Sequence, residues 1–316
     1  MPRKMLPGVR LALIVVVCGL SFSNASSNVH AQGAKPKINY REPAREYVEL
    51  QVDGRVLQVE KQLVDEDEEL ATAAVERLKA RFDEALAIFP EHSREGLQDM
   101  PLFVLYGPKA THGGRPSGMA YFRKEAPTHR KDIDPRWGRS VVVYSADNYV
   151  KLRDLWAIKG VVHELAHAYH LEHWPEKEQG ILTAWENAMA RGLYHGVKND
   201  QEKVLDKAYA TVNQLEYFAE LTCMYFVRCD YHPFDRRQLA AYDPAGHAMI
   251  EKYWKPPKEY ELRTWTDRSG KFSVKAKFKS AASGKITLVK EDDSEITVES
   301  AVLSEEDRSY LRDLQR

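Results

Sequence analysis

The sequence has little cysteine, almost no net charge and only one long apolar run, and each shortage excludes a class of protein. Three of the 316 residues are cysteine, which is too few for a fold held together by disulfides. The formal net charge is -1 and the charged residues are scattered, so no basic stripe indicates a nucleic-acid partner and we expect none. The length is sufficient for two folded units with substantial cores.

The one long apolar run, residues 11–20, follows several basic residues and predicts a signal peptide. Small residues that suit a signal peptidase come after it, at Ala25 and Ala31. The alternative is an uncleaved anchor, but the run is shorter than the roughly 20 apolar residues that cross a bilayer. We therefore assign residues 1–31 to a signal peptide. We expect an exported protein, periplasmic or extracellular, with no stable membrane span after cleavage.

Cleavage leaves two cysteines, Cys223 and Cys229. If both lie on one helix, the rise of 1.5 Å per residue separates them by about 9 Å, beyond the roughly 7 Å limit for a bridge. We expect two buried free thiols. A disulfide would require the helix to end between them.

The chain up to residue 255 combines strand and helix patterns. A polar linker covers residues 32–45, and a hairpin pattern surrounds Asp53-Gly54 within residues 47–59. Strands are expected at residues 102–106 and 140–144, with an internal strand near 119–122, and helices at residues 65–89, 152–173, 181–193, 201–226 and 244–254. This pattern predicts an α+β domain over residues 46–255.

The pattern changes beyond residue 255. Pro256 and Pro257 interrupt the chain, and we assign residues 256–260 to a second linker. Residues 261–316 carry short alternating runs separated by turn residues, which predict a small all-β unit with a barrel-like core. The expected core residues are Trp265, Phe272, Val274, Phe278, Ile286, Leu288, Ile296 and Val298. Ser304 and Asp307 have the spacing of a capping box and predict a short final helix.

The most informative segment is His163-Glu164-Leu165-Ala166-His167. Two histidines four residues apart on a helix lie on the same face, so both imidazoles can bind one zinc ion. The glutamate between them is the general base in this motif and acts on the water that the zinc activates. A zinc ion in a catalytic site then needs one more protein ligand.

Two residues compete for the third ligand position. His173 stands where the metzincins have their third histidine, but their pattern needs a glycine three residues earlier to turn the chain, and His170 occupies that position. On a straight helix His173 lies about 15 Å from His163 along the axis. His170 is either a surface histidine or one that supports the site without binding metal. Glu216 is the better candidate, because a second helix can present its carboxylate to the ion.

Glu216 begins the segment Glu216-Tyr217-Phe218-Ala219-Glu220. Glu220 lies one turn later, and we expect it to orient a histidine rather than to bind the metal. Together with the histidine helix, this segment resembles the gluzincin group that contains anthrax lethal factor and Pro-Pro endopeptidase. In that group a Glu-aromatic-Phe-Ala-Glu segment follows the two histidines.

The resemblance covers roughly residues 102–226 and implies a zincin-like metallopeptidase domain. The implied cofactor is zinc, and the implied metal ligands are His163, His167 and Glu216. The group also has a tyrosine seven residues before its glutamate ligand, close to the scissile carbonyl. That position is Tyr209 in this chain.

The motif and the resemblance together imply metal-assisted hydrolysis of a protein or peptide substrate, with the following roles. Zinc lowers the pKa of its water and polarises the carbonyl, while Glu164 takes the proton and delivers it to the leaving amine. Tyr209 donates a hydrogen bond to the developing oxyanion. In such enzymes an extended substrate usually lies beside an edge strand. Residues 140–144, just upstream of the zinc helix, are either that edge strand or an ordinary core strand.

The C-terminal unit resembles a different family. The segments RTWTDRSGKF (residues 263–272), KITLVK (285–290) and LSEED (303–307) are similar to the first Sla homology domain. That domain is an SH3-like fold known from a yeast endocytic adaptor, where it binds Asn-Pro-Phe-x-Asp peptides, and from exported planctomycete proteins. The resemblance covers residues 261–311 and implies an SH3-like barrel with a protein or peptide partner.

The leading hypothesis is an exported zinc endopeptidase followed by a binding module. The alternative from another class is a peptide- or matrix-binding protein whose peptidase-like domain holds zinc without turnover. The presence of Glu164 and Tyr209 argues against it, because a protein that has lost catalysis does not need its base. A metzincin-type peptidase that uses His173 is a third possibility.

Overall fold

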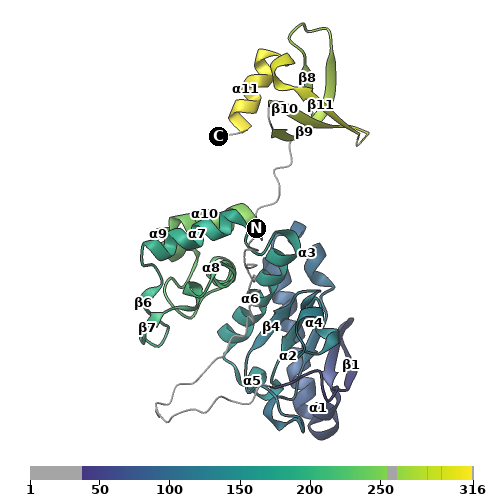
Figure 1. Ribbon diagram of the computed structural model, residues 1–316, viewed down its shortest axis with the longest axis vertical. Coiled ribbons are helices and arrows are strands. Elements are labelled where there is room, and N and C mark those ends of the chain that lie inside the picture. Colours follow the sequence, from purple (N-terminus) through teal and green to yellow (C-terminus); the bar gives the residue numbers. More distant parts are fainter. Residues whose placement is uncertain (1–37, 255–261, 283, 293, 315–316) are drawn as a thin grey trace, which may run out of the picture. The chain divides into compact units, whose positions relative to one another are not determined.

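The computed structural model describes residues 38–254, 262–282, 284–292 and 294–314 (Figure 1). The predicted signal peptide and the predicted linker of residues 256–260 lie outside these ranges. The chain divides into two compact units between Lys255 and Pro256, and each unit has its own hydrophobic core. Among the described helices, none combines the length and the apolar character needed to cross a bilayer.

The first unit is mixed α+β and contains a five-stranded sheet. Its strands are β1 (Tyr47–Val52), β2 (Arg55–Glu60), β3 (Leu102–Val104), β4 (Met119–Phe122) and β5 (Ser140–Val143), in the order β1-β2-β3-β5-β4. β1 and β2 form the predicted antiparallel hairpin. Asp53 and Gly54 both have positive φ at its turn, which is what a two-residue type I′ turn requires. β2, β3 and β5 are parallel, and β4 runs antiparallel to β5.

This strand order decides where the free edges of the sheet lie. β5, one of our two expectations for the edge strand, lies between β3 and β4 and is buried along its whole length. The edge-strand interpretation of residues 140–144 is therefore wrong, and the core-strand interpretation is confirmed. The two edge strands are β1 and β4, and β4 is the one that packs against α6.

Alternate residues of the sheet pack into two separate clusters. On one face, Val141 and Val143 of β5 belong to the main core with the helices. On the other face, Val142 and Tyr144 pack with Trp137 and Tyr40, as the two-residue side-chain period of a strand requires.

The second cluster corrects one predicted boundary. We expected residues 32–45 to be linker, yet from residue 38 onward the chain lies on the first unit. The Tyr40 ring is buried with its centroid 4.9 Å from that of Trp137, and Arg45 forms a buried ion pair with Glu60. The polar composition of this segment hid the role of Tyr40, whose ring packs on this face of the sheet.

The helices of the first unit are α1 (Lys61–Glu66), α2 (Glu68–Ile88), α3 (Glu91–Gln98), α4 (Ala126–His129), α5 (Ala146–Lys151), α6 (Asp154–His173), α7 (Gln179–Ala190), α8 (Gln214–Phe226), α9 (Arg236–Tyr242) and α10 (Pro244–Trp254). α6 packs against α2, α8 and β4. The helices predicted at residues 152–173, 181–193 and 244–254 are confirmed, with end shifts of a few residues. The helix predicted at 65–89 is α2 together with the end of α1, and Asp67 caps the start of α2.

The single helix predicted over residues 201–226 is wrong in its first half. Residues there form β7 (Val204–Lys207), which pairs with β6 (His195–Lys198), followed by the short 3-10 helix η3 (Tyr209–Thr211). α8 begins only after Asn213, whose side chain accepts hydrogen bonds from the amides of Leu215 and Glu216. Asparagine is a strong N-cap residue, so the sequence itself marked the true helix start.

The second unit is a four-stranded antiparallel sheet with one helix. Its elements are β8 (Arg263–Thr266), β9 (Ser273–Ala282), β10 (Lys285–Lys290), β11 (Glu295–Glu299), the short 3-10 helix η4 (Ser300–Val302) and α11 (Glu305–Leu314), with strand order β11-β10-β9-β8. Of the predicted core residues, Trp265, Phe278, Ile286 and Leu288 are buried, and Val274, Ile296 and Val298 pack against them. The predicted cap of α11 is confirmed, since the Asp307 amide donates to Ser304 Oγ at 3.2 Å.

Phe272 is the exception among the predicted core residues, because its side chain is 74 % exposed. It lies just before β9, in the turn where its amide donates to Asp267. Alternation predicts the inward face only within a strand, so the pattern did not apply at this position.

Candidate metal centre

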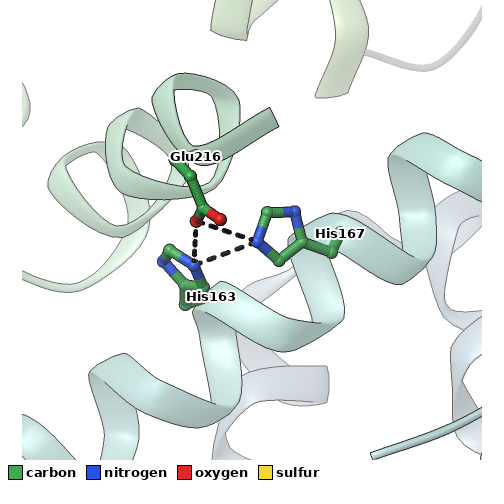
Figure 2. A group of neighbouring side chains, drawn as sticks. All are labelled: His163, His167 and Glu216. Atoms are coloured by element: carbon green, nitrogen blue, oxygen red, sulfur yellow. Dashed lines mark hydrogen bonds and ion pairs between the residues drawn. The ribbon is translucent and has the colours of Figure 1, made fainter. Parts of the chain in front are cut away.

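α6 and α8 bring three predicted ligands together (Figure 2). His163 and His167 are one turn apart on α6 and face α8. Glu216 lies in the first turn of α8, where the Asn213 cap fixes the start of the helix. All three side chains are at most 1 % exposed.

The three donor atoms lie at nearly equal distances. His163 Nε2 is 3.0 Å from His167 Nε2 and 3.0 Å from Glu216 Oε2, and His167 Nε2 is 3.3 Å from the same oxygen. Ligand atoms at about 2.0–2.1 Å from a tetrahedral zinc ion are separated by about 3.3 Å. The spacing of these two nitrogens and one oxygen therefore fits one zinc ion.

The hydrogen bonds around His163 explain why this group attracts a cation. His163 Nδ1 lies 2.9 Å from Glu220 Oε1, and a carboxylate only accepts, so Nδ1 carries the hydrogen. In a neutral imidazole this leaves Nε2 with a lone pair, and that lone pair meets the Glu216 carboxylate. Two such acceptors in contact need a proton or a metal ion between them. The contact between Glu220 and a histidine was predicted, and it is confirmed.

Without a metal, a proton takes this place. Burial by itself lowers the pKa of His163, but contacts with Cys223, Glu216 and Glu220 outweigh it and raise the pKa well above its usual value. Burial lowers the pKa of His167. Burial by itself would raise the pKa of Glu216, but its contacts with His163 and His167 hold that pKa below its usual range. The carboxylate of Glu216 is therefore ionised and available as a ligand.

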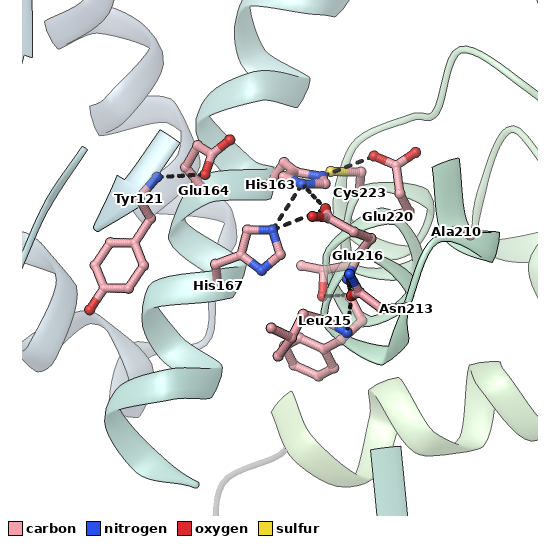
Figure 3. Close-up of polar contacts among 12 residues, drawn as sticks. Tyr121, His163, Glu164, His167, Ala210, Asn213, Leu215, Glu216, Glu220 and Cys223 are labelled. Atoms are coloured by element: carbon pink, nitrogen blue, oxygen red, sulfur yellow. Dashed lines mark hydrogen bonds and ion pairs between the residues drawn. The ribbon is translucent and has the colours of Figure 1, made fainter. Parts of the chain in front are cut away.

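Glu164, the predicted base, faces away from the ligand cluster toward β4 (Figure 3). Its Oε2 accepts a hydrogen bond of 2.7 Å from the Tyr121 amide. Its Oε1 is buried and has no hydrogen-bond partner among the described residues. Burial raises the pKa of the Glu164 carboxyl to about 8, against the opposing charge of His163. One oxygen is thus fixed and the other is free to accept a proton.

Tyr209, the other predicted catalytic residue, begins η3. Its ring centroid lies 5.8 Å from that of His163, so the structure brings it to the same site. The next residue, Ala210, donates its amide to the Tyr231 hydroxyl at 3.1 Å, and this contact holds the η3 turn.

The sequence interpretation missed Lys159 and Asp230, which lie behind His163. Lys159 is 1 % exposed, and its ammonium contacts Glu220 Oε2 at 2.9 Å and Asp230 Oδ1 at 2.6 Å. Burial favours a raised pKa for Glu220, but Lys159 and His163 lower it to about 2. Lys159 precedes His163 by four residues, so helical spacing was an available signal. Asp230 lies beyond the end of α8, where no helical spacing relates it to the other residues of the site.

The other two histidines of α6 do not join the cluster. The helix continues without a turn to His173, whose Nδ1 contacts the Tyr169 carbonyl. His170 is buried rather than on the surface, and its Nε2 donates to the Pro175 carbonyl at 3.1 Å. Cys223 and Cys229 are both buried free thiols, as predicted, although α8 ends between them.

Comparison with known proteins identifies the second unit. Residues 254–316 match the family model of SLA1 homology domain 1, so the predicted C-terminal Sla homology domain is confirmed. No curated protein matches the chain.

Proposed function

We propose that the first unit is a zinc-dependent endopeptidase of the gluzincin type. The observation that carries the proposal is the buried group of His163 Nε2, His167 Nε2 and Glu216 Oε2, whose mutual distances are 3.0–3.3 Å. The same three residues form a group of metal-ligand type. The unpartnered oxygen of Glu164 on the same helix adds the second requirement, which is a carboxylate that can move a proton.

The donor set fits zinc better than calcium or magnesium. Two imidazole nitrogens and one carboxylate are a common catalytic zinc set, whereas calcium and magnesium are bound mainly by oxygen. When bound, zinc acts as a Lewis acid that polarises a peptide carbonyl and makes water more acidic. His163, His167 and Glu216 would hold the ion, and a catalytic zinc with three protein ligands would have room to bind water or substrate.

The residues of this chain divide the remaining work. Glu164 Oε1 accepts a proton from water and later passes it to the leaving amine, while the Tyr121 amide holds Oε2. Tyr209, beside His163, donates a hydrogen bond to the oxygen that gains negative charge. Glu220 keeps the His163 ring in the tautomer whose Nε2 is a ligand.

The sheet offers a place for an extended substrate. β4 pairs only with β5 among the described strands, so its other edge has no strand partner there, and we assign this edge to a peptide in β-strand conformation. This edge adjoins Glu164 through the Tyr121 amide. The sequence resemblance to the lethal factor and Pro-Pro endopeptidase group supports the same substrate class, a protein or peptide.

The second unit extends this proposal. An SLA1 homology domain 1 is a protein-binding module in the family from which it is known, so we assign it the capture of a protein or peptide partner. The apolar run at residues 11–20 supports export, with the enzyme working in the periplasm or outside the cell.

The test combines metal analysis with peptide cleavage. The chain from residue 32 is purified, its zinc content is measured, and a diverse peptide library is incubated with it and read by mass spectrometry. We expect about one zinc per chain and defined cleavage sites. Glu164→Gln should abolish cleavage with zinc retained, and the matched control Glu186→Gln, an exposed glutamate on α7, should cleave normally.

Two results would overturn the proposal. Cleavage that persists in Glu164→Gln or in the presence of a chelator would show that the activity belongs to another site or to a contaminant. Stoichiometric zinc with no cleavage of any peptide would instead favour the non-catalytic binding protein.

A further inference from the structure

We propose that Gly160 is a positioning residue for the catalytic base, because it sets the distance between α6 and β4 at which the Tyr121 amide reaches Glu164. This inference rests on the proposed peptidase function. It concerns residues on the side of α6 that faces β4, whereas His163 and His167 face α8.

Two contacts between α6 and β4 lie next to each other. Glu164 Oε2 accepts a hydrogen bond of 2.7 Å from the Tyr121 amide, which is at the short end of the normal range. Gly160 lies one helical turn before Glu164, and Met119 lies two residues before Tyr121. Residues four apart on a helix share a face, so Gly160 faces β4 beside Glu164.

The Gly160 contact is close enough that a side chain does not fit without movement. A Cβ atom built on Gly160 would lie 3.2 Å from Met119 Sδ and 3.4 Å from Met119 Cε. Met119 is 1 % exposed and belongs to the main core, so its side chain has little free space. An added methyl group therefore either displaces Met119 or moves the helix and the strand apart.

Glycine at position 160 destabilises α6. A glycine in a helix interior costs about 1 kcal/mol relative to alanine, and Gly160 lies in the middle of α6. Its φ is not positive, so backbone geometry does not require glycine. The remaining reason for glycine is the close approach of the Met119 side chain from β4, and the same strand carries the Tyr121 amide that holds the base.

The consequence for catalysis follows from the distance. A shift of a few tenths of an ångström would lengthen the hydrogen bond from 2.7 Å toward the long end of the normal range, about 3.2 Å, and would weaken it further if its angle also changed. The one hydrogen bond of Glu164 among the described residues would then hold its carboxylate less tightly, and the carboxylate would sample other rotamers more often. A displacement of about 1 Å in a reacting group costs about a hundredfold in rate, so we expect about a tenfold loss of kcat in Gly160→Ala and more in Gly160→Val.

The experiment uses the full mature chain and measures four quantities: kcat, KM, zinc content and hydrogen exchange at the Tyr121 amide. In Gly160→Ala we expect kcat to fall about tenfold, KM and zinc content to stay unchanged, and the Tyr121 amide to exchange faster. Adding Met119→Ala removes Met119 Sδ and Cε, the two atoms nearest to the added methyl group. The double variant should therefore recover the wild-type kcat, and its Tyr121 amide should again exchange slowly.

Gly180→Ala is the matched control. Gly180 is also helical, and a Cβ there would lie 2.2 Å from the Tyr253 hydroxyl, on helices that do not carry the candidate site. This variant should lower the free energy of unfolding without changing kcat or the hydrogen-exchange rate of the Tyr121 amide. Equal losses of kcat in Gly160→Ala and Gly180→Ala would assign the effect to general destabilisation and overturn the inference.

Two further outcomes separate this inference from the proposed function. Normal kcat and normal Tyr121 exchange in Gly160→Ala would overturn the positioning role and leave the peptidase intact. A wild-type chain that cleaves nothing with zinc bound would remove the proposed function and with it the catalytic meaning of Gly160. Because amide exchange is measured without turnover, it still reports whether Gly160 controls the contact in that case.

Discussion

Replacing Lys159 with methionine removes a buried positive charge from between two buried carboxylates, and we expect the first unit to lose about 3–5 kcal/mol of unfolding free energy. The Lys159 ammonium lies 2.9 Å from Glu220 and 2.6 Å from Asp230, and its side chain is 2 % exposed. Methionine has a similar length and no charge. The variant therefore tests the loss of the charge rather than the loss of volume.

The magnitude follows from what remains after the substitution. Glu220 keeps its contact with His163, but among the described residues the Asp230 carboxylate then keeps only the contact with the Cys229 thiol, at 3.7 Å. Removing one partner of a buried ion pair is costly because the other charge stays buried without compensation. The double variant Lys159→Met with Asp230→Asn removes one of these charges and should recover about 1–2 kcal/mol.

The assay is urea unfolding in the presence of a chelator, followed by tryptophan fluorescence, so that bound metal does not contribute. With an m value of about 3 kcal/mol/M, the midpoint should fall by about 1 M or more. Lys198→Met is the matched control, because its ion pair with Glu202 is exposed and exposed pairs contribute little to stability. A loss below about 1 kcal/mol in Lys159→Met, or one equal to the control, would refute the reasoning.

Three more predictions follow from other residues. Burial lowers the pKa of His170 to about 4, so as the pH falls the unfolded chain binds a proton at this residue before the folded chain does. The free energy of unfolding should therefore fall by about 3 kcal/mol between about pH 6.5 and about pH 4. Unfolding measured at each pH should show no such loss in His170→Gln. Glu216→Gln should lose zinc on dialysis and His173→Ala should retain it, and the reverse result would support the metzincin alternative. Gly246→Ala places a Cβ 2.5 Å from Asp243 Oδ2 and from the Tyr217 hydroxyl and should lower stability by about 1–3 kcal/mol in thermal unfolding; an unchanged midpoint would contradict this packing.

Features that depend on neighbours within a few residues were predictable from the sequence. The four-residue spacing of His163 and His167 placed both imidazoles on one face of a helix, and the structure has them there. The Asp53-Gly54 pair predicted a tight hairpin, and the helix expected at residues 244–254 is α10. In each case the signal and the structure that it predicts lie in the same short segment.

Predictions failed where a local pattern was extended beyond its own element. Apolar spacing carried the helix prediction back from α8 to residue 201, although Asn213 marked the true start. Alternation carried the core prediction from β9 to Phe272, which lies in the turn. A polar composition made residues 38–45 resemble linker, although Tyr40 covers one face of the sheet.

The sequence by itself determined the histidine helix, the residue types of the candidate ligands and the identity of the C-terminal module, because each depends on a short contiguous pattern. Only the tertiary structure decided that Glu216, 53 residues after His163, meets it at 3.0 Å. It also decided that Lys159 is buried against Asp230, 71 residues later, and that β4 rather than β5 is an edge strand. Such contacts depend on how α6, α8 and the sheet pack together, and no local period of the chain encodes that packing.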